Sequence, residues 1–129
     1  MLRTILPLVI SAFLWISAPL QAQAEQFQII SKQSEFLSLV NGKILTVKNP
    51  FFLRNAIRLT VRRNGEIQGS ALRYDLTGNW SWQGGYFCRE MDWSGTPIPY
   101  NCQQVQYDGD RVRFVSDRGT GGNAIFSID

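Results

Sequence analysis

The feature that most constrains the fold of this chain is an alternation of apolar and polar residues, which begins at Ile57 and recurs as far as Ile128. Side chains two positions apart lie on the same face of a β-strand, so the alternation predicts half-buried strands. Asn64-Gly65 and Asp108-Gly109-Asp110 are typical of the tight turns between such strands. Together with 43–47, the pattern predicts about eight short strands, over 43–47, 57–62, 67–74, 80–82, 86–93, 100–107, 111–115 and 124–128.

One helical spacing precedes the strands. Phe36, Leu39 and Val40 follow the i, i+3, i+4 pattern of an amphipathic helix over 34–40, and Asn41-Gly42 is a typical helix stop. No second helical pattern follows a strand, which argues against a parallel sheet of βαβ units. The expected fold class is mainly β: a small antiparallel up-and-down meander or lipocalin-like barrel, with one short N-terminal helix covering one end.

The first 24 residues have the pattern of a secretory signal peptide. Arg3 is followed by an apolar run over 5–20, and Ala22-Gln23-Ala24 is a small-x-small cleavage site. The run is shorter than the roughly 20 residues that span a bilayer comfortably. We therefore expect a cleaved signal over 1–24 and a single periplasmic or secreted domain over 25–129, with no membrane anchor after cleavage.

Charge and composition exclude several kinds of site. Loss of Arg3 with the signal lowers the formal net charge from +3 to +2, which does not suggest a nucleic-acid partner. The chain has no histidine, so Ser-His-Asp catalysis and imidazole metal sites are impossible. Two cysteines are too few for a four-thiolate zinc site. We expect no metal and no cofactor.

The two cysteines predict one disulfide. In an exported protein an even pair of cysteines is typical of a disulfide, here Cys88–Cys102 on consecutive strands. The intervening 94–99 contains Pro97 and Pro99, so we expect a stiff loop that prevents strand pairing through it.

The densest aromatic cluster is the main candidate for a ligand site. Two hypotheses stand for it: the aromatic side chains fill the barrel core, or they line a ligand pocket or contact surface. The candidate ligand-binding residues are Trp80, Trp82, Tyr86, Trp93 and Tyr100, with Phe87 among them in the sequence.

Three further groups have a functional and a plain interpretation. Glu90 and Asp92 share one strand face, which fits either paired acid–base carboxylates or a solvated strand. Gly119-Thr120-Gly121-Gly122 lacks the ending of a P-loop and is expected to be a flexible hairpin loop. Two arginine pairs, Arg58 with Arg62 and Arg111 with Arg113, would form a basic stripe if their strands are near neighbours.

Several motifs also carry a family resemblance. They are Phe36-Leu37-Ser38-Leu39-Val40-x-Gly42-Lys43, Gly65, Gly69, Thr77-Gly78-x-Trp80-Ser81-Trp82, Gly85-Tyr86-Phe87-Cys88-Arg89, Asp92-Trp93-Ser94-Gly95, Tyr100-Asn101-Cys102-Gln103, Arg113-Phe114 and Asp117-x-Gly119. On these residues the chain resembles a family of small exported alphaproteobacterial proteins of unknown function, members of which often carry the label dihydrodipicolinate reductase. That label implies a Rossmann domain and a catalytic histidine, and this chain has neither a dinucleotide fingerprint nor a histidine.

The sequence therefore supports two classes of function. The first is a non-enzymatic barrel module that binds a protein partner or a small apolar ligand. One variant is a lipocalin-like protease inhibitor, suggested by the G-x-W of Gly78-Asn79-Trp80. The alternative is an enzyme, either the labelled reductase or a hydrolase that uses Glu90 and Asp92.

Overall fold

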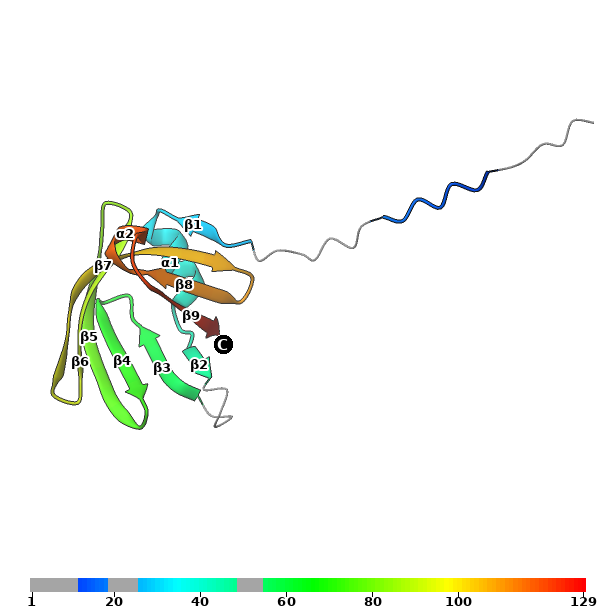
Figure 1. Cartoon of the computed structure of the whole chain (residues 1–129). Coiled ribbons are helices and arrows are strands. Elements are labelled where there is room, and N and C mark those ends of the chain that lie inside the picture. Colours follow the sequence, from blue (N-terminus) through cyan, green and yellow to red (C-terminus); the bar gives the residue numbers. More distant parts are fainter. Residues whose placement is uncertain (1–11, 19–25, 49–54) are drawn as a thin grey trace, which may run out of the picture.

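The computed structural model describes residues 12–18, 26–48 and 55–129, and its folded part is a β-barrel with two short helices (Figure 1). The strands are β1 (Gln28–Ile30), β2 (Leu45–Lys48), β3 (Asn55–Val61), β4 (Glu66–Ala71), β5 (Tyr74–Gln83), β6 (Tyr86–Trp93), β7 (Thr96–Asp108), β8 (Arg111–Val115) and β9 (Asn123–Ile128). The helices are α1 (Gln33–Val40), between β1 and β2, and α2 (Ser116–Gly119), between β8 and β9.

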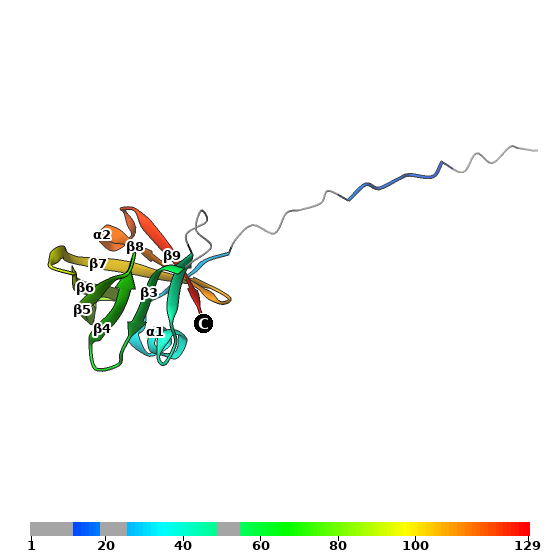
Figure 2. The same cartoon turned by 90° about the horizontal axis from the view of Figure 1, so that it is seen from below.

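Strands β2 to β9 form the barrel. Each pairs antiparallel with the next along the chain, from β2–β3 to β8–β9. The β2–β9 pair then closes the ring, through Leu45 opposite Ile128 and Thr46 opposite Ser127. Figure 2 shows the strands curling around a common axis. The predicted mainly β class, a small antiparallel meander closed into a barrel, is confirmed, and each of the eight predicted strands overlaps one strand of the barrel.

Strand β1 lies outside that ring and was not predicted. Its three residues pair with Val105 to Tyr107 of β7. The β6–β7 pairing ends at Gln103, so this later part of the same edge of β7 is available to β1. Because β7 is longer than either neighbour, it pairs with β6 along one part and with β1 along the rest. A three-residue strand is too short to show the alternation on which sequence analysis depends.

Helix α1 closes one end of the barrel, as the helical spacing predicted. Phe36 and Val40 are fully buried. The Phe36 ring contacts rings from three strands: Trp80 and Trp82 of β5, Phe87 of β6 and Phe114 of β8, with centroids 5.1–6.2 Å away. A single ring that contacts several strands lies inside the barrel, so side chains fill the interior at this end.

One predicted strand contains a turn. The pattern indicated a continuous strand over 67–74, but Leu72 and Arg73 form the turn between β4 and β5. Both residues have positive φ, 50° and 74°. Such turns usually carry glycine or asparagine because other side chains strain there, so this pair gave no turn signal.

The loop predicted over 94–99 is also shorter than expected. Strand β7 begins at Thr96, and Pro97 and Ile98 pair with β6, so only Ser94 and Gly95 form the turn. Proline cannot donate to a ladder and is tolerated where a strand edge is free. The other edge of β7 pairs with β8 only from Gln104 onward, so the prolines occupy a stretch of β7 with no β8 partner.

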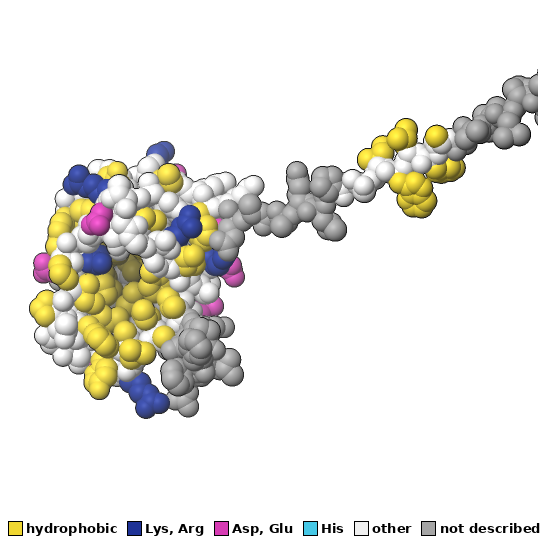
Figure 3. All heavy atoms as spheres, viewed as in Figure 1, with side chains coloured by type: hydrophobic (Ala, Val, Ile, Leu, Met, Phe, Trp, Pro, Cys, Tyr) yellow, Lys and Arg dark blue, Asp and Glu magenta, His cyan; other side chains and the backbone are white. Residues whose placement is uncertain are grey.

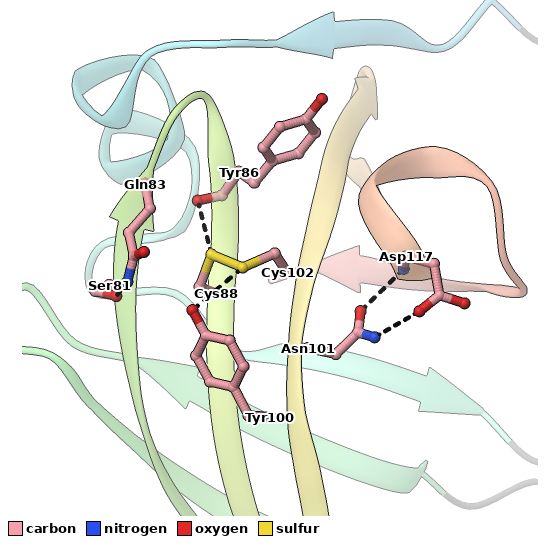
Figure 4. The surroundings of a disulfide bond; sticks show 8 residues. All are labelled: Ser81, Gln83, Tyr86, Cys88, Tyr100, Asn101, Cys102 and Asp117. Atoms are coloured by element: carbon pink, nitrogen blue, oxygen red, sulfur yellow. Dashed lines mark hydrogen bonds between the residues drawn. A yellow bond between two sulfur atoms is a disulfide. The ribbon is translucent and has the colours of Figure 1, made fainter.

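The predicted disulfide is confirmed. Cys88 and Cys102 lie directly opposite each other on β6 and β7, and their Cα atoms are 3.9 Å apart (Figure 4). The Tyr100 hydroxyl donates to Cys102 Sγ at 3.3 Å, since a disulfide sulfur has no proton to give. Nearby, Asn101 and Asp117 exchange two hydrogen bonds that attach α2 to β7.

Most of the predicted signal peptide, including its cleavage site, falls outside the described residues. The described part, 12–18, is exposed and contains no helix or strand. Within the residues that the structure describes, no helix is long and apolar enough to cross a membrane.

Candidate ligand-binding site

The open half of the barrel contains a cavity of about 470 Å³. Figure 3 shows the hollow, whose visible walls are hydrophobic. The apolar lining comes from β2 to β9: Leu45, Ala56, Ile57, Leu59, Val61, Ile67, Ala71, Leu72, Leu76, Phe87, Met91, Trp93, Ile98, Phe114, Ala124 and Phe126. Among the described residues, only Arg89 and Gln103 add polar groups to it. The cavity extends from Phe87 and Phe114, which contact Phe36 of α1, to Leu72 and Trp93 at the turns of the opposite end.

Two glycines of the barrel wall, Gly69 on β4 and Gly78 on β5, allow neighbouring strands to approach closely. Gly69 pairs with Leu59, which lines the cavity, and a Cβ at Gly69 would lie 1.9 Å from the Arg58 carbonyl oxygen. Gly78 is similar, since its Cβ would lie 2.4 Å from the Glu90 carbonyl oxygen. Only glycine allows the backbones to approach so closely, and neither position places a side chain in the interior.

Arg89 is the charged residue of the lining. On β6 it shares a face with Phe87, Met91 and Trp93, all of which line the cavity, so its side chain faces inward. Its Nη1 donates to the Pro99 carbonyl at 2.6 Å. The β6–β7 register shifts between Arg89, which pairs with Asn101, and Met91, which pairs with Ile98, so Pro99 lies within this irregularity. Burial lowers the pKa of the Arg89 guanidinium from its ordinary value, but an arginine remains charged at neutral pH.

The five aromatic candidates do not share one site. Trp93 lines the cavity, and its indole Nε1 donates to the Ala71 carbonyl at 3.0 Å. Trp80 and Trp82 pack around Phe36 at the closed end, where their Nε1 atoms donate to the Arg62 and Ser31 carbonyls.

The remaining two candidates are tyrosines. Tyr86 begins β6 and is half-buried, with the Arg118 guanidinium 5.7 Å from its ring centroid. Tyr100 is exposed beside the disulfide. The core hypothesis thus describes the two closed-end tryptophans best, and the pocket hypothesis describes Trp93. Ligand binding by the five residues remains a prediction.

Glu90 and Asp92 lie on the outer face of β6, because they alternate with the residues that line the cavity. They border a surface depression of about 510 Å³ that also includes Glu66 and the two prolines of β7. Asp92 Oδ1 accepts a hydrogen bond from the Gly95 N–H at 2.7 Å and so stabilises the β6–β7 turn. Glu90 is exposed. This arrangement is typical of a solvated strand face.

The two arginine pairs do not form one stripe. Strands β3 and β8 are separated by β2 and β9 in the barrel order. Arg62 lies 4.0 Å from Glu66, and Arg111 forms an ion pair with Asp108 at 2.9 Å. Arg113 bonds to Gln106. A hairpin loop was expected at the glycine-rich 119–122. The connection from β8 to β9 instead contains α2, which ends at Gly119, and the remaining glycine-rich residues lead from α2 into β9.

Sequence reasoning missed Arg89, Met91, Ile98 and Gln103 as cavity residues. One signal could have identified Arg89. It shares a strand face with Phe87, Met91 and Trp93, so a charged residue occupies a position where the alternation calls for an apolar one.

Within the described residues, no three His, Cys, Asp or Glu side chains lie close enough together to hold a metal ion. A comparison of the chain with models of protein families, with curated proteins and with solved structures finds no match in any of the three.

Proposed function

We propose that this chain is an exported, non-enzymatic binding module whose barrel takes up a small, largely apolar ligand. The cavity carries the proposal. Its volume of about 470 Å³ falls within the roughly 300–1,000 Å³ of small-molecule sites, and a mostly apolar lining with a few polar groups is typical of them. Export is supported by the disulfide and by the signal pattern of residues 1–24.

The hydrolase alternative has weaker support. Asp92 is already engaged by the Gly95 N–H, and both carboxylates face away from the cavity. A catalytic carboxylate must reach the reacting atoms of the substrate. The carboxylates of Glu90 and Asp92 border the open depression on the outer face, so they would not reach a substrate held in the cavity.

The direct test is binding of an uncharged apolar dye, N-phenyl-1-naphthylamine, followed by the increase in its fluorescence and by the quenching of tryptophan fluorescence. Ala71→Trp places an indole in the cavity wall, and we expect it to weaken dye binding by about tenfold, equivalent to about 1.4 kcal/mol.

Ser70→Trp is the matched control, because Ser70 is the preceding residue on β4 and faces the opposite side of the sheet. We expect it to leave dye affinity unchanged. If the dye does not bind the wild-type protein, or if both variants weaken its binding equally, the proposed cavity function is wrong.

A further inference from the structure

The cavity contains a positive charge and, among its described lining residues, no negative one. Arg89 is half-buried there. The structure gives it one hydrogen bond, to a neutral carbonyl, and no described carboxylate lies within ion-pair distance. Burying a charge without a counter-charge is costly, and residues that do so in clefts are candidates for function. The charge balance of this cavity therefore favours an anion.

The guanidinium is well placed to bind one. The hydrogen bond to Pro99 holds one Nη in place, while a guanidinium has five N–H donors in a rigid planar fork. A fork that is already fixed loses little conformational entropy when it binds, and it matches a carboxylate with two parallel hydrogen bonds. Gln103 adds a neutral amide to the same cavity.

The position of Arg89 also indicates the length of the ligand. Along β6, Phe87 lies toward the closed end and Trp93 lies next to the β6–β7 turn at the open end. Four residues of strand separate Arg89 from Trp93, or about 13 Å at roughly 3.3 Å per residue. An extended chain advances about 1.2 Å per bond, so this distance corresponds to roughly ten carbons.

We propose that the barrel binds an amphipathic carboxylate, with its carboxylate on Arg89 and an aliphatic body of roughly ten carbons extending between Met91, Ile98 and Trp93 toward the open end. This inference rests on the proposed function and specifies the class of ligand. It assigns Arg89 the role of recognising the anionic end, while the apolar walls supply non-directional affinity.

The test compares decanoic acid with 1-decanol, which has the same aliphatic body without the charge. Each displaces N-phenyl-1-naphthylamine from the wild-type protein at neutral pH. We expect decanoate to displace the dye at a concentration about tenfold lower than decanol, because a charge-assisted pair with the guanidinium is available only to the carboxylate.

Three variants assign this preference to one residue. Arg89→Met keeps a long side chain but removes the charge, and we expect it to abolish the preference for decanoate over decanol. Arg89→Lys should retain part of the preference. Arg58→Met, on the exposed outer face of β3, is the matched control for the loss of one positive charge and should retain all of it.

The outcomes separate the two proposals. No dye binding to the wild-type protein overturns the proposed function. Dye binding with equal displacement by decanoate and decanol leaves the cavity function in place and overturns the assignment of an anionic ligand. A preference for decanoate that survives in Arg89→Met also overturns the role of Arg89. If Arg89→Met, and not Arg58→Met, loses dye binding, Arg89 maintains the structure of the cavity, and its role in recognising the carboxylate is overturned.

Discussion

The two ends of this barrel are built from the same strands and yet are packed differently. At the closed end Phe36 enters from α1 and meets four other aromatic rings, and its side chain has no exposed surface. At the open end the inward residues Met91, Trp93 and Ile98 are only half-buried and surround a cavity of about 470 Å³. The strand pattern thus builds the wall, and the residue sizes determine whether the interior is filled.

The two ends therefore contribute differently to stability and to binding. A close-packed interior gains dispersion contacts on every side, while the lining of a void lacks partners on one side. Half-exposed apolar side chains around an opening stabilise the fold less than the same side chains in a core. A ligand that fills the cavity supplies the missing contacts, so the open end is the part of the barrel that binding can stabilise.

The largest effect on stability is expected at Phe36, in the packed end of the barrel. Phe36→Ala removes a fully buried ring from between β5, β6 and β8. We expect a loss of about 3–5 kcal/mol in the free energy of unfolding, the range for phenylalanine-to-alanine changes in cores. Urea unfolding followed by tryptophan fluorescence measures it.

The control for Phe36 is Ser38→Ala, at an exposed position of the same helix. A shift of less than about 0.5 kcal/mol is expected there, as for surface positions in general. Equal losses for the two variants would mean that α1 does not close the barrel and that the two ends are packed alike.

The second prediction concerns the disulfide, the covalent link between β6 and β7. Cys88 and Cys102 close a loop with a sequence separation of 14 residues, for which the chain-entropy model gives about 3 kcal/mol. We expect reduction, or the double variant Cys88→Ala/Cys102→Ala, to lower the free energy of unfolding by about this amount. The circular dichroism spectrum should stay that of a β-barrel.

Agreement between the reduced protein and the double variant is the control, because one removes the bond and the other also removes the thiols. A loss of β-sheet signal on reduction would show that the β6–β7 ladder depends on the bond. Two free thiols in protein purified from an oxidising compartment would contradict the disulfide itself.

Most of the fold was predictable because alternation is a local signal. Each barrel strand carries it, and in Arg111–Val115 the predicted and observed bounds coincide. The failures occur where the local signal conflicts with the wider fold. Leu72 and Arg73 adopt positive φ without glycine. Pro97 pairs with β6 although proline usually ends pairing, because the opposite edge of β7 has no β8 partner there.

The candidate site was much less predictable. The sequence indicated the aromatic cluster, but a strand pattern gives the face of a residue and not its height along the barrel. Trp80, Trp82 and Trp93 share an inward face, and only the last reaches the cavity. Gly69 and Gly78 are required by the close approach of neighbouring strand backbones, which the sequence alone does not show.

The smallest effect on stability is expected at Met91, in the open end of the barrel. Met91 is half-buried and lines the cavity, so Met91→Ala removes side-chain atoms that already lack partners on one side. We expect a loss of about 1 kcal/mol, below the 2–5 kcal/mol for methionine in a packed core. Because the change enlarges the cavity, binding of N-phenyl-1-naphthylamine should persist. Urea unfolding and dye titration of the same variant measure both quantities. A loss as large as that of Phe36→Ala, with dye binding abolished, would mean that the open end is packed as a core and contains no site.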